Sequence, residues 1–206
     1  MIVESGDFSG LRYKVAYPND FDKSRKYPVL FFFHGAGERG DNLDLIDVHG
    51  TFKEIKNGKE FDFICVSPQC DGGVVWFDML SIVKDFIKDF IQDESVDKSR
   101  VFLSGISMGG YMSWQLLMSL SQVFSKAVIC CGGGMYWNAG QIKAKVLVFH
   151  GKDDDVVFPD ESVKMVNAIN ASNGSASLTL FDNTGHDCWT RVFSDPEIYK
   201  WLMQGE

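Results

Sequence analysis

The chain has 206 residues, of which 45% are hydrophobic and 23% charged, and its formal net charge at pH 7 is −8. These values are typical of one globular domain, which we expect over residues 1–206, and the acidic balance argues against a nucleic acid or an anionic membrane as partner. No apolar run is long enough to span a bilayer, and the first ten residues lack the pattern of a secretory leader. We therefore expect a cytoplasmic protein, and secretion stays open if a leader has been trimmed.

The cysteines predict neither a disulfide framework nor a zinc site. Their number is odd, two are adjacent, and three lie in apolar runs where a free thiol packs as a small hydrophobe. The five positions are Cys65, Cys70, Cys130, Cys131 and Cys188. We expect no metal and no cofactor.

Strand patterns alternate with helix patterns along the chain. An alternating stretch at 11–17 predicts a half-exposed strand, and continuous apolar runs predict buried strands at 28–33, 61–67, 100–104, 126–131, 145–149 and 177–181. Apolar residues spaced by three and four predict helices at 79–91, after residue 107, at 159–169 and at 198–203, with a short helix within 43–55. This alternation predicts an α/β fold with a doubly wound, mostly parallel sheet and helices on both faces.

The strand at 100–104 leads directly into Gly105-Ile106-Ser107-Met108-Gly109. A Gly-x-Ser-x-Gly sequence between a strand and a helix is typical of a nucleophile elbow, where a sharp turn presents the serine hydroxyl above the sheet. Gly105 and Gly109 suit this turn because side chains there would collide across the bend. We therefore predict that Ser107 is a nucleophile.

A serine nucleophile needs a base, and the base needs an acid that orients it. In the order Ser, Asp, His that is usual for this arrangement, His186 is the one histidine that follows the acidic turn at 152–155. The residues alone leave the acid open among Asp153, Asp154, Asp155, Asp182 and Asp187.

Two backbone N–H groups should stabilise the oxyanion that forms on the substrate. One is expected from Met108, which follows the nucleophile at the start of a helix. The other is expected from Ala36 or Gly37, in the glycine-rich loop that follows His34 at the end of a buried strand.

Five segments resemble the α/β-hydrolase superfamily, in particular its small, lidless phospholipase/carboxylesterase and feruloyl-esterase-like members, a group that includes sequences labelled as predicted peptidases. They are the stretches 34–40, 67–69 with a following tryptophan, 105–110, 150–157 and 185–189. The resemblance implies an α/β-hydrolase fold without a large cap domain. It also implies that Asp154 is the acid, four residues after the histidine of a His-Gly pair. In the family the proline follows the Val-Val pair directly, whereas here Phe158 separates Val157 from Pro159. A shift of one residue would make Asp155 the acid, so Asp155 stays an alternative.

Aromatic residues fall on loops at the expected active edge of the sheet and predict substrate contacts. We name Trp76, Trp137 and Trp189 as candidates, together with Glu38 beside the oxyanion loop. Aromatic faces can stack on a sugar ring or on a phenolic acyl group, although large aromatic side chains also close small cores.

These features predict a serine hydrolase that cleaves carboxylic esters through an acyl-enzyme, with aromatic (feruloyl-type) or carbohydrate-linked esters as candidate substrates. The expected partner is a small-molecule or oligosaccharide ester. Two alternatives stay open: a serine peptidase that uses the same triad, and a non-catalytic binding protein of the same fold. The acyl and alcohol groups and the oligomeric state do not follow from the sequence.

Overall fold

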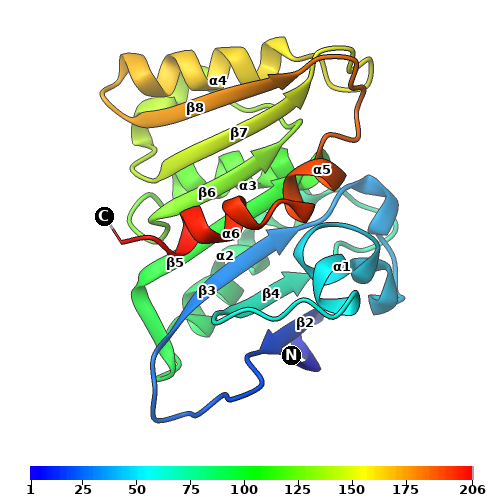
Figure 1. Ribbon diagram of the computed structural model, residues 1–206, viewed down its shortest axis with the longest axis vertical. Coiled ribbons are helices and arrows are strands. Elements are labelled where there is room, and N and C mark those ends of the chain that lie inside the picture. The colour runs from blue at the N-terminus through cyan, green and yellow to red at the C-terminus, as the bar shows by residue number, and fades with distance from the viewer. Residues whose placement is uncertain (206) are drawn as a thin grey trace.

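The computed structural model describes residues 1–205, whose strands form one eight-stranded sheet in the order β1-β2-β4-β3-β5-β6-β7-β8 (Figure 1). Strands β3 to β8 run parallel, whereas β2 pairs antiparallel with both β1 and β4. This confirms the predicted mostly parallel sheet. The strands are β1 (Ile2–Phe8), β2 (Leu11–Tyr17), β3 (Tyr27–Phe33), β4 (Ile64–Pro68), β5 (Val96–Ile106), β6 (Lys126–Cys130), β7 (Lys145–Gly151) and β8 (Ser175–Phe181).

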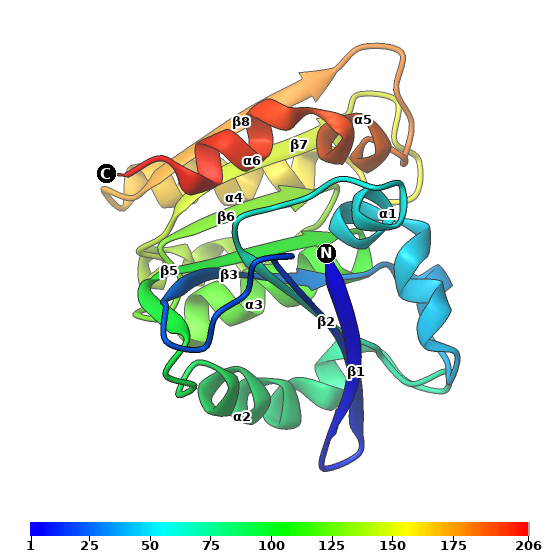
Figure 2. The ribbon, with the colours of Figure 1, turned by 60° about the horizontal axis from the view of Figure 1, so that its bottom comes forward.

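Helices cover both faces of the sheet, as predicted (Figures 1 and 2). One face carries α2 (Leu80–Phe90), α3 (Met108–Ser119) and α4 (Asp160–Ala171), and the other carries α1 (Gly50–Lys56), α5 (Trp189–Ser194) and α6 (Pro196–Met203). Short 3₁₀ helices lie in the connections: η1 (Ala36–Glu38), η2 (Leu43–Val48), η3 (Trp76–Met79) and η4 (Tyr136–Gln141).

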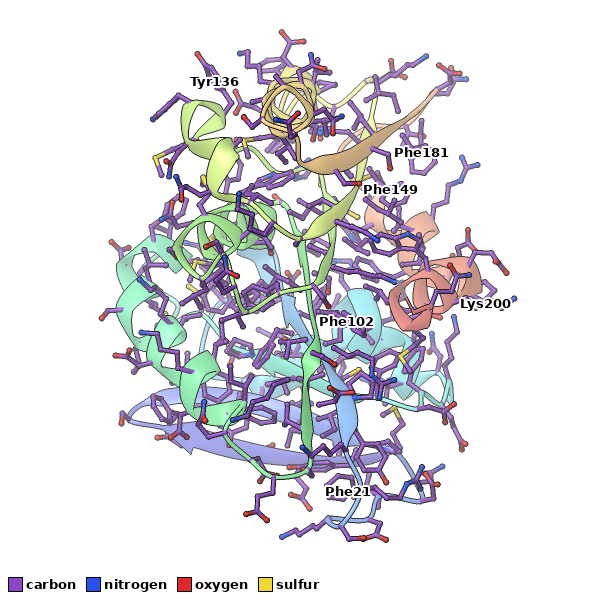
Figure 3. The ribbon with its side chains drawn as sticks, turned by 90° about the vertical axis from the view of Figure 1, so that its left-hand side faces the viewer. Phe21, Phe102, Tyr136, Phe149, Phe181 and Lys200 are labelled. Carbon is purple, nitrogen blue, oxygen red and sulfur yellow. The ribbon has the colours of Figure 1, made fainter. Side chains whose placement is uncertain are left out.

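Strand β3 shows why the central strands are apolar throughout. Phe31 and Phe33 pack into the core beneath α2, α3 and α4, whereas Leu30 and Phe32 pack into the core beneath α1, α5 and α6. Figure 3 shows the sheet edge-on between these two layers, with Phe102 near its centre. Each fully buried side chain of this size contributes roughly 1.5–3 kcal/mol to the free energy of unfolding. No position on such a strand faces water, so the sequence shows a continuous apolar run.

Most observed elements agree with the predicted ranges within a few residues, and the exceptions have a physical cause. Strand β1 was not predicted because it lies at the sheet edge and is mostly exposed, which leaves it little apolar pattern. Strand β5 begins at Val96, in a polar stretch that precedes the apolar run. The six-residue helix α5 is too short to show a periodic pattern.

The connections are short on the side where a cap would lie. Within residues 1–205, the connection from β6 to β7 contains only the 3₁₀ helix η4, and no large cap domain is present. The helices described by the structure are also too short or too polar for one of them to cross a membrane.

The parallel strands bring the predicted site residues to one edge of the sheet. His34 follows β3, Ser107 follows β5, Asp154 follows β7 and His186 follows β8. The carboxyl ends of parallel strands meet at the same edge, which is where open α/β sheets bind ligands.

The buried His34 ties the loop after β3 to the rest of this edge. Its Nδ1–H donates to the Gly35 carbonyl (2.6 Å), and its Nε2 accepts the backbone N–H of Cys70 (3.0 Å). The indole N–H of Trp76 donates to the His34 carbonyl (3.0 Å). Burial lowers the pKa of His34 from 6.5 to about 4. The neutral imidazole therefore joins the backbone after β3 to the backbone after β4, and the His34 carbonyl holds Trp76.

We predict that this histidine makes the protein sensitive to acid. The unfolded chain takes up a proton near pH 6.5 and the folded chain only near pH 4, so stability falls as the pH falls through this window. The two pKa values correspond to a loss of about 3 kcal/mol. Urea unfolding between pH 7 and 4 should show that His34→Gln has a lower free energy of unfolding than the wild-type protein at pH 7. Its free energy of unfolding should also fall less steeply with pH than that of the wild-type protein. An identical fall in the free energy of unfolding of both proteins would show that His34 is not the source of the acid sensitivity.

Candidate active site

Ser107 occupies the sharp turn between β5 and α3 that the sequence predicts. Its backbone has φ 51° and ψ −118°, a conformation that costs a non-glycine residue strain energy. A side chain at Gly105 would collide with the Gly109 carbonyl and with Ser113, and one at Gly109 would collide with the Phe33 carbonyl. Both glycines are therefore required by close backbone packing around the serine.

His186 joins this serine to a carboxylate. The Ser107 Oγ–H donates to His186 Nε2 (2.8 Å), and His186 Nδ1–H donates to Asp154 Oδ2 (2.7 Å). His186 lies in the loop between β8 and α5, where its carbonyl accepts the backbone N–H of Cys188 (2.9 Å). Thus the structure brings Ser107, His186 and Asp154 into one hydrogen-bonded chain.

Asp154 is the acidic residue that contacts the histidine, whereas the other candidates lie at the surface. Asp153 and Asp155 are exposed. Asp182 pairs with Lys152, and Asp187 accepts the backbone N–H of Thr190. The extra residue Phe158 therefore does not shift the contact from Asp154 to Asp155.

The environment of Asp154 favours its charged form. Its side chain is fully buried, and burial by itself would raise the pKa of the carboxyl. The hydrogen bond from His186 and the backbone N–H groups of Val157 (3.0 Å) and Val156 (2.9 Å) outweigh this effect and lower its pKa. The carboxylate is thus ionised and fixed in direction.

A second histidine, His150, supports the carboxylate from within the core, and sequence reasoning gave it no role in the site. Its Nε2–H donates to the Val157 carbonyl (2.8 Å) and lies 3.1 Å from Asp154 Oδ2. Its Nδ1 accepts the hydroxyl of Ser162 (2.7 Å). The His-Gly pair at the end of β7 was the available signal, since it places this ring directly before the acidic turn.

The two segments that carry the predicted oxyanion donors both adjoin Ser107. Met108 is the first residue of α3, so its N–H has no acceptor one turn earlier in the helix. Ala36 and Gly37 are exposed in η1, directly after Gly35. A Cβ at Gly35 would lie 3.7 Å from the Ser107 Cβ, which shows how closely this loop approaches the nucleophile.

Two open cavities lie on the α3 side of the site, and the serine lines the first of them. The first has a volume of about 280 Å³ and is lined by Val75, Trp76, Phe77, Ser107, Met108 and Tyr111. The second has a volume of about 450 Å³ and shares Phe77 and Tyr111 with the first. It continues along α3 to Met135 and Glu161. The surface available to a ligand next to the nucleophile is therefore mainly apolar.

The predicted substrate contacts occupy different positions relative to these cavities. Trp76 is 1% exposed, and only part of its ring surface reaches the first cavity, because its indole N–H is engaged with the His34 carbonyl. Trp137 is 73% exposed and lines neither cavity. Its neighbour Tyr136 points away from the sheet into solvent (Figure 3). Trp189 packs against the ring of His186 with a centroid distance of 5.2 Å.

Glu38 is the last residue of η1 and lines neither cavity. Its carboxylate is nearly buried and lies 3.6 Å from His49 Nε2 and 3.9 Å from His34 Nδ1. Burial raises the pKa of Glu38, and nearby His49 partly opposes this effect. The ring of His49 in turn packs against Trp189 (5.4 Å). Glu38 thus belongs to a polar and aromatic cluster that reaches His186 through His49 and Trp189.

One group of side chains near the histidine has the composition of a metal site. The ligand atoms of Cys131, Asp154 and His186 lie within 4.8 Å of one another. Burial raises the pKa of the Cys131 thiol, which therefore stays protonated. The other two side chains, His186 and Asp154, are hydrogen-bonded to each other, so their closeness follows from that bond.

Comparison with known proteins links this geometry to a family. The sequence model described as phospholipase/carboxylesterase matches residues 21–202. A curated relative, "Probable feruloyl esterase C" from Aspergillus niger, is 24% identical over 191 residues, which cover 89% of this chain and 70% of the relative.

Solved structures share the fold. The crystal structure of a thermostable esterase has a TM-score of 0.82 at 24% identity, over 98% of this chain and 62% of that one. An acylaminoacyl peptidase from Pyrococcus horikoshii has a TM-score of 0.70 at 17% identity, over 94% of this chain and 38% of that one. The chain is thus shorter than these proteins. The match to the family over nearly its whole length, on an α/β-hydrolase fold, shows that this chain belongs to the phospholipase/carboxylesterase family.

Proposed function

We propose that this chain hydrolyses carboxylic esters through Ser107, His186 and Asp154. The observation that carries the proposal is the position of His186, which is hydrogen-bonded to the serine through one ring nitrogen and to the carboxylate through the other. Membership of an esterase family supports the type of reaction.

In the first half of the reaction, His186 Nε2 takes the proton of Ser107 as the serine oxygen attacks the ester carbonyl carbon. The N–H groups of Met108 and of Ala36 or Gly37 stabilise the oxyanion. The imidazolium formed on His186 is stabilised by the buried Asp154 carboxylate. It then protonates the departing alcohol and leaves an acyl group on the serine.

In the second half, water replaces the alcohol. His186 takes a proton from the water, the resulting hydroxide attacks the acyl carbon, and the serine oxygen leaves with that proton. The products are the carboxylic acid and the regenerated enzyme. Each of these steps uses the same three side chains and the same N–H donors.

The substrates that we propose are aromatic (feruloyl-type) or carbohydrate-linked esters. An apolar cavity with aromatic side chains adjoins the nucleophile, which suits a planar acyl group. A relative named as a feruloyl esterase supports the same choice. On the opposite side, the ring of Trp189 is half-buried beside His186, where the alcohol part would leave.

We predict that Ser107→Ala lowers kcat on a 4-nitrophenyl ester by about 10⁴-fold or more, because no other group in the site supplies the attacking oxygen. The wild-type protein should also react with a fluorophosphonate probe at Ser107, which mass spectrometry would locate. Ser119→Ala, at the exposed end of α3, serves as a matched control. An unlabelled wild-type protein would favour the non-catalytic alternative.

A second prediction concerns the acid. Asp154→Asn should lower kcat by about 10³–10⁴-fold, because an amide no longer stabilises the imidazolium or the required tautomer. Asp153→Asn and Asp155→Asn remove the same charge from exposed neighbours and should keep nearly full activity. Asp154 is not the acid if Asp153→Asn or Asp155→Asn lowers kcat more than Asp154→Asn does.

A third prediction separates an esterase from a peptidase. On a 4-nitrophenyl ester and a 4-nitroanilide of the same acid, the ester should be hydrolysed far faster, because an amine leaves less readily than a phenol. Initial rates with wild-type protein and Ser107→Ala give the comparison. Equal rates on both compounds would favour the peptidase.

A further inference from the structure

The cavity that Ser107 lines adjoins the second cavity, and we treat the two together as one groove. They share Phe77 and Tyr111, so the space that begins at Ser107 continues past these rings along α3. Both Phe77 (51%) and Met135 (36%) are exposed, although they are large and apolar. A ligand that covers them would remove apolar surface from water, which favours binding.

The groove is on the acyl side of the nucleophile. Ser107 and Met108 line its beginning, whereas His186 does not line it. In the proposed reaction His186 gives its proton to the departing alcohol, so the alcohol leaves on the side of the histidine. The acyl group stays bonded to the serine and is the part of the ester that the groove can hold.

The second cavity carries a carboxylate. Glu161 lies in the first turn of α4 and lines the second cavity together with Gln115. Its carboxylate and the ring of Tyr111 both lie next to Gly133, where a Cβ in place of the glycine would be 2.4 Å from Glu161 Oε2 and 2.9 Å from Tyr111 Cε1. Glu161 is half-buried and forms no ion pair with any residue that the structure describes.

The pKa of Tyr111 supports this arrangement. Burial raises the pKa of its hydroxyl, and the nearby carboxylates of Glu161 and Asp154 raise it further. Tyr111 lines both the cavity that contains Ser107 and the cavity that contains Glu161. A molecule bound along this ring would extend from Ser107 towards Glu161.

We infer that the groove binds acyl groups with an apolar body and a hydrogen-bond donor at the distal end, such as a phenolic hydroxyl, and that Glu161 determines this specificity. The inference rests on the proposed ester hydrolysis. An ionised carboxylate only accepts hydrogen bonds, so it favours a hydroxyl tip. A purely alkyl tip would take water from the carboxylate without replacing its hydrogen bonds, and this costs free energy.

The test compares the methyl esters of 4-hydroxycinnamic and 4-methoxycinnamic acid, which share the leaving alcohol and the apolar body and differ in the donor. We expect the wild-type protein to favour the hydroxy ester in kcat/KM by about tenfold or more, the effect of one hydrogen bond to a charged group. Glu161→Ala should bring the ratio close to one. Glu161→Gln should keep part of the preference, because the amide oxygen still accepts a hydrogen bond.

Asp160→Ala is the matched control, because it removes the same charge from the same helix turn at an exposed position outside the groove. It should leave the ratio of the two esters as in the wild-type protein. Equal hydrolysis of both esters by the wild-type protein, or a ratio that Glu161→Ala does not change, would overturn the inference. Absence of any hydrolysis above the level of Ser107→Ala would instead overturn the proposed function.

Discussion

The close contact between the first turn of α3 and the ends of β3 and β5 is the constraint on which the site depends. Gly109 lies against the carbonyl of Phe33, and Gly105 lies against the carbonyl of Gly109, so neither position has room for a side chain. This packing holds Ser107 at a positive φ, a conformation that costs of order 1–3 kcal/mol for a residue other than glycine. The buried strands on either side supply the stability that offsets this strain, and the serine hydroxyl is consequently held at the mouth of a helix.

A buried carboxylate would be costly without partners, and the way in which Asp154 is satisfied explains much of the surrounding sequence. One oxygen accepts two backbone N–H groups from the turn at 156–157, and the other accepts His186 and adjoins His150. His150 is itself held by Ser162 from α4. These contacts link the β7 loop, α4 and the β8 loop, so the acid cannot rotate away from the histidine without breaking several hydrogen bonds.

The central part of the site could be predicted from the sequence because two simple rules apply to it. Strands buried on both faces appear as apolar runs, and parallel strands deliver their loops to one edge, so Ser107, the acidic turn at 152–155 and His186 were predicted to lie together. The choice of Asp154 within that turn came from the family resemblance. The rest depends on neighbours that are distant in sequence. Trp76 donates its indole N–H to the His34 carbonyl, and Glu38 lies beside His34 and His49. The groove is lined by residues of α3, α4 and η3. No local pattern contains this information.

The site is asymmetric because the two faces of the sheet contribute different walls. Helices α3 and α4 on one face contribute to the apolar groove, which Glu161 also lines, whereas α1 and α5 on the other face bring His49 and Trp189 to the side of His186. In the proposed reaction the acyl group stays on the serine and the alcohol leaves past the histidine. The two halves of an ester therefore meet different elements of the fold. Selection for the acyl group can change through residues of α3 and α4 without disturbing the hydrogen-bonded chain that performs the chemistry.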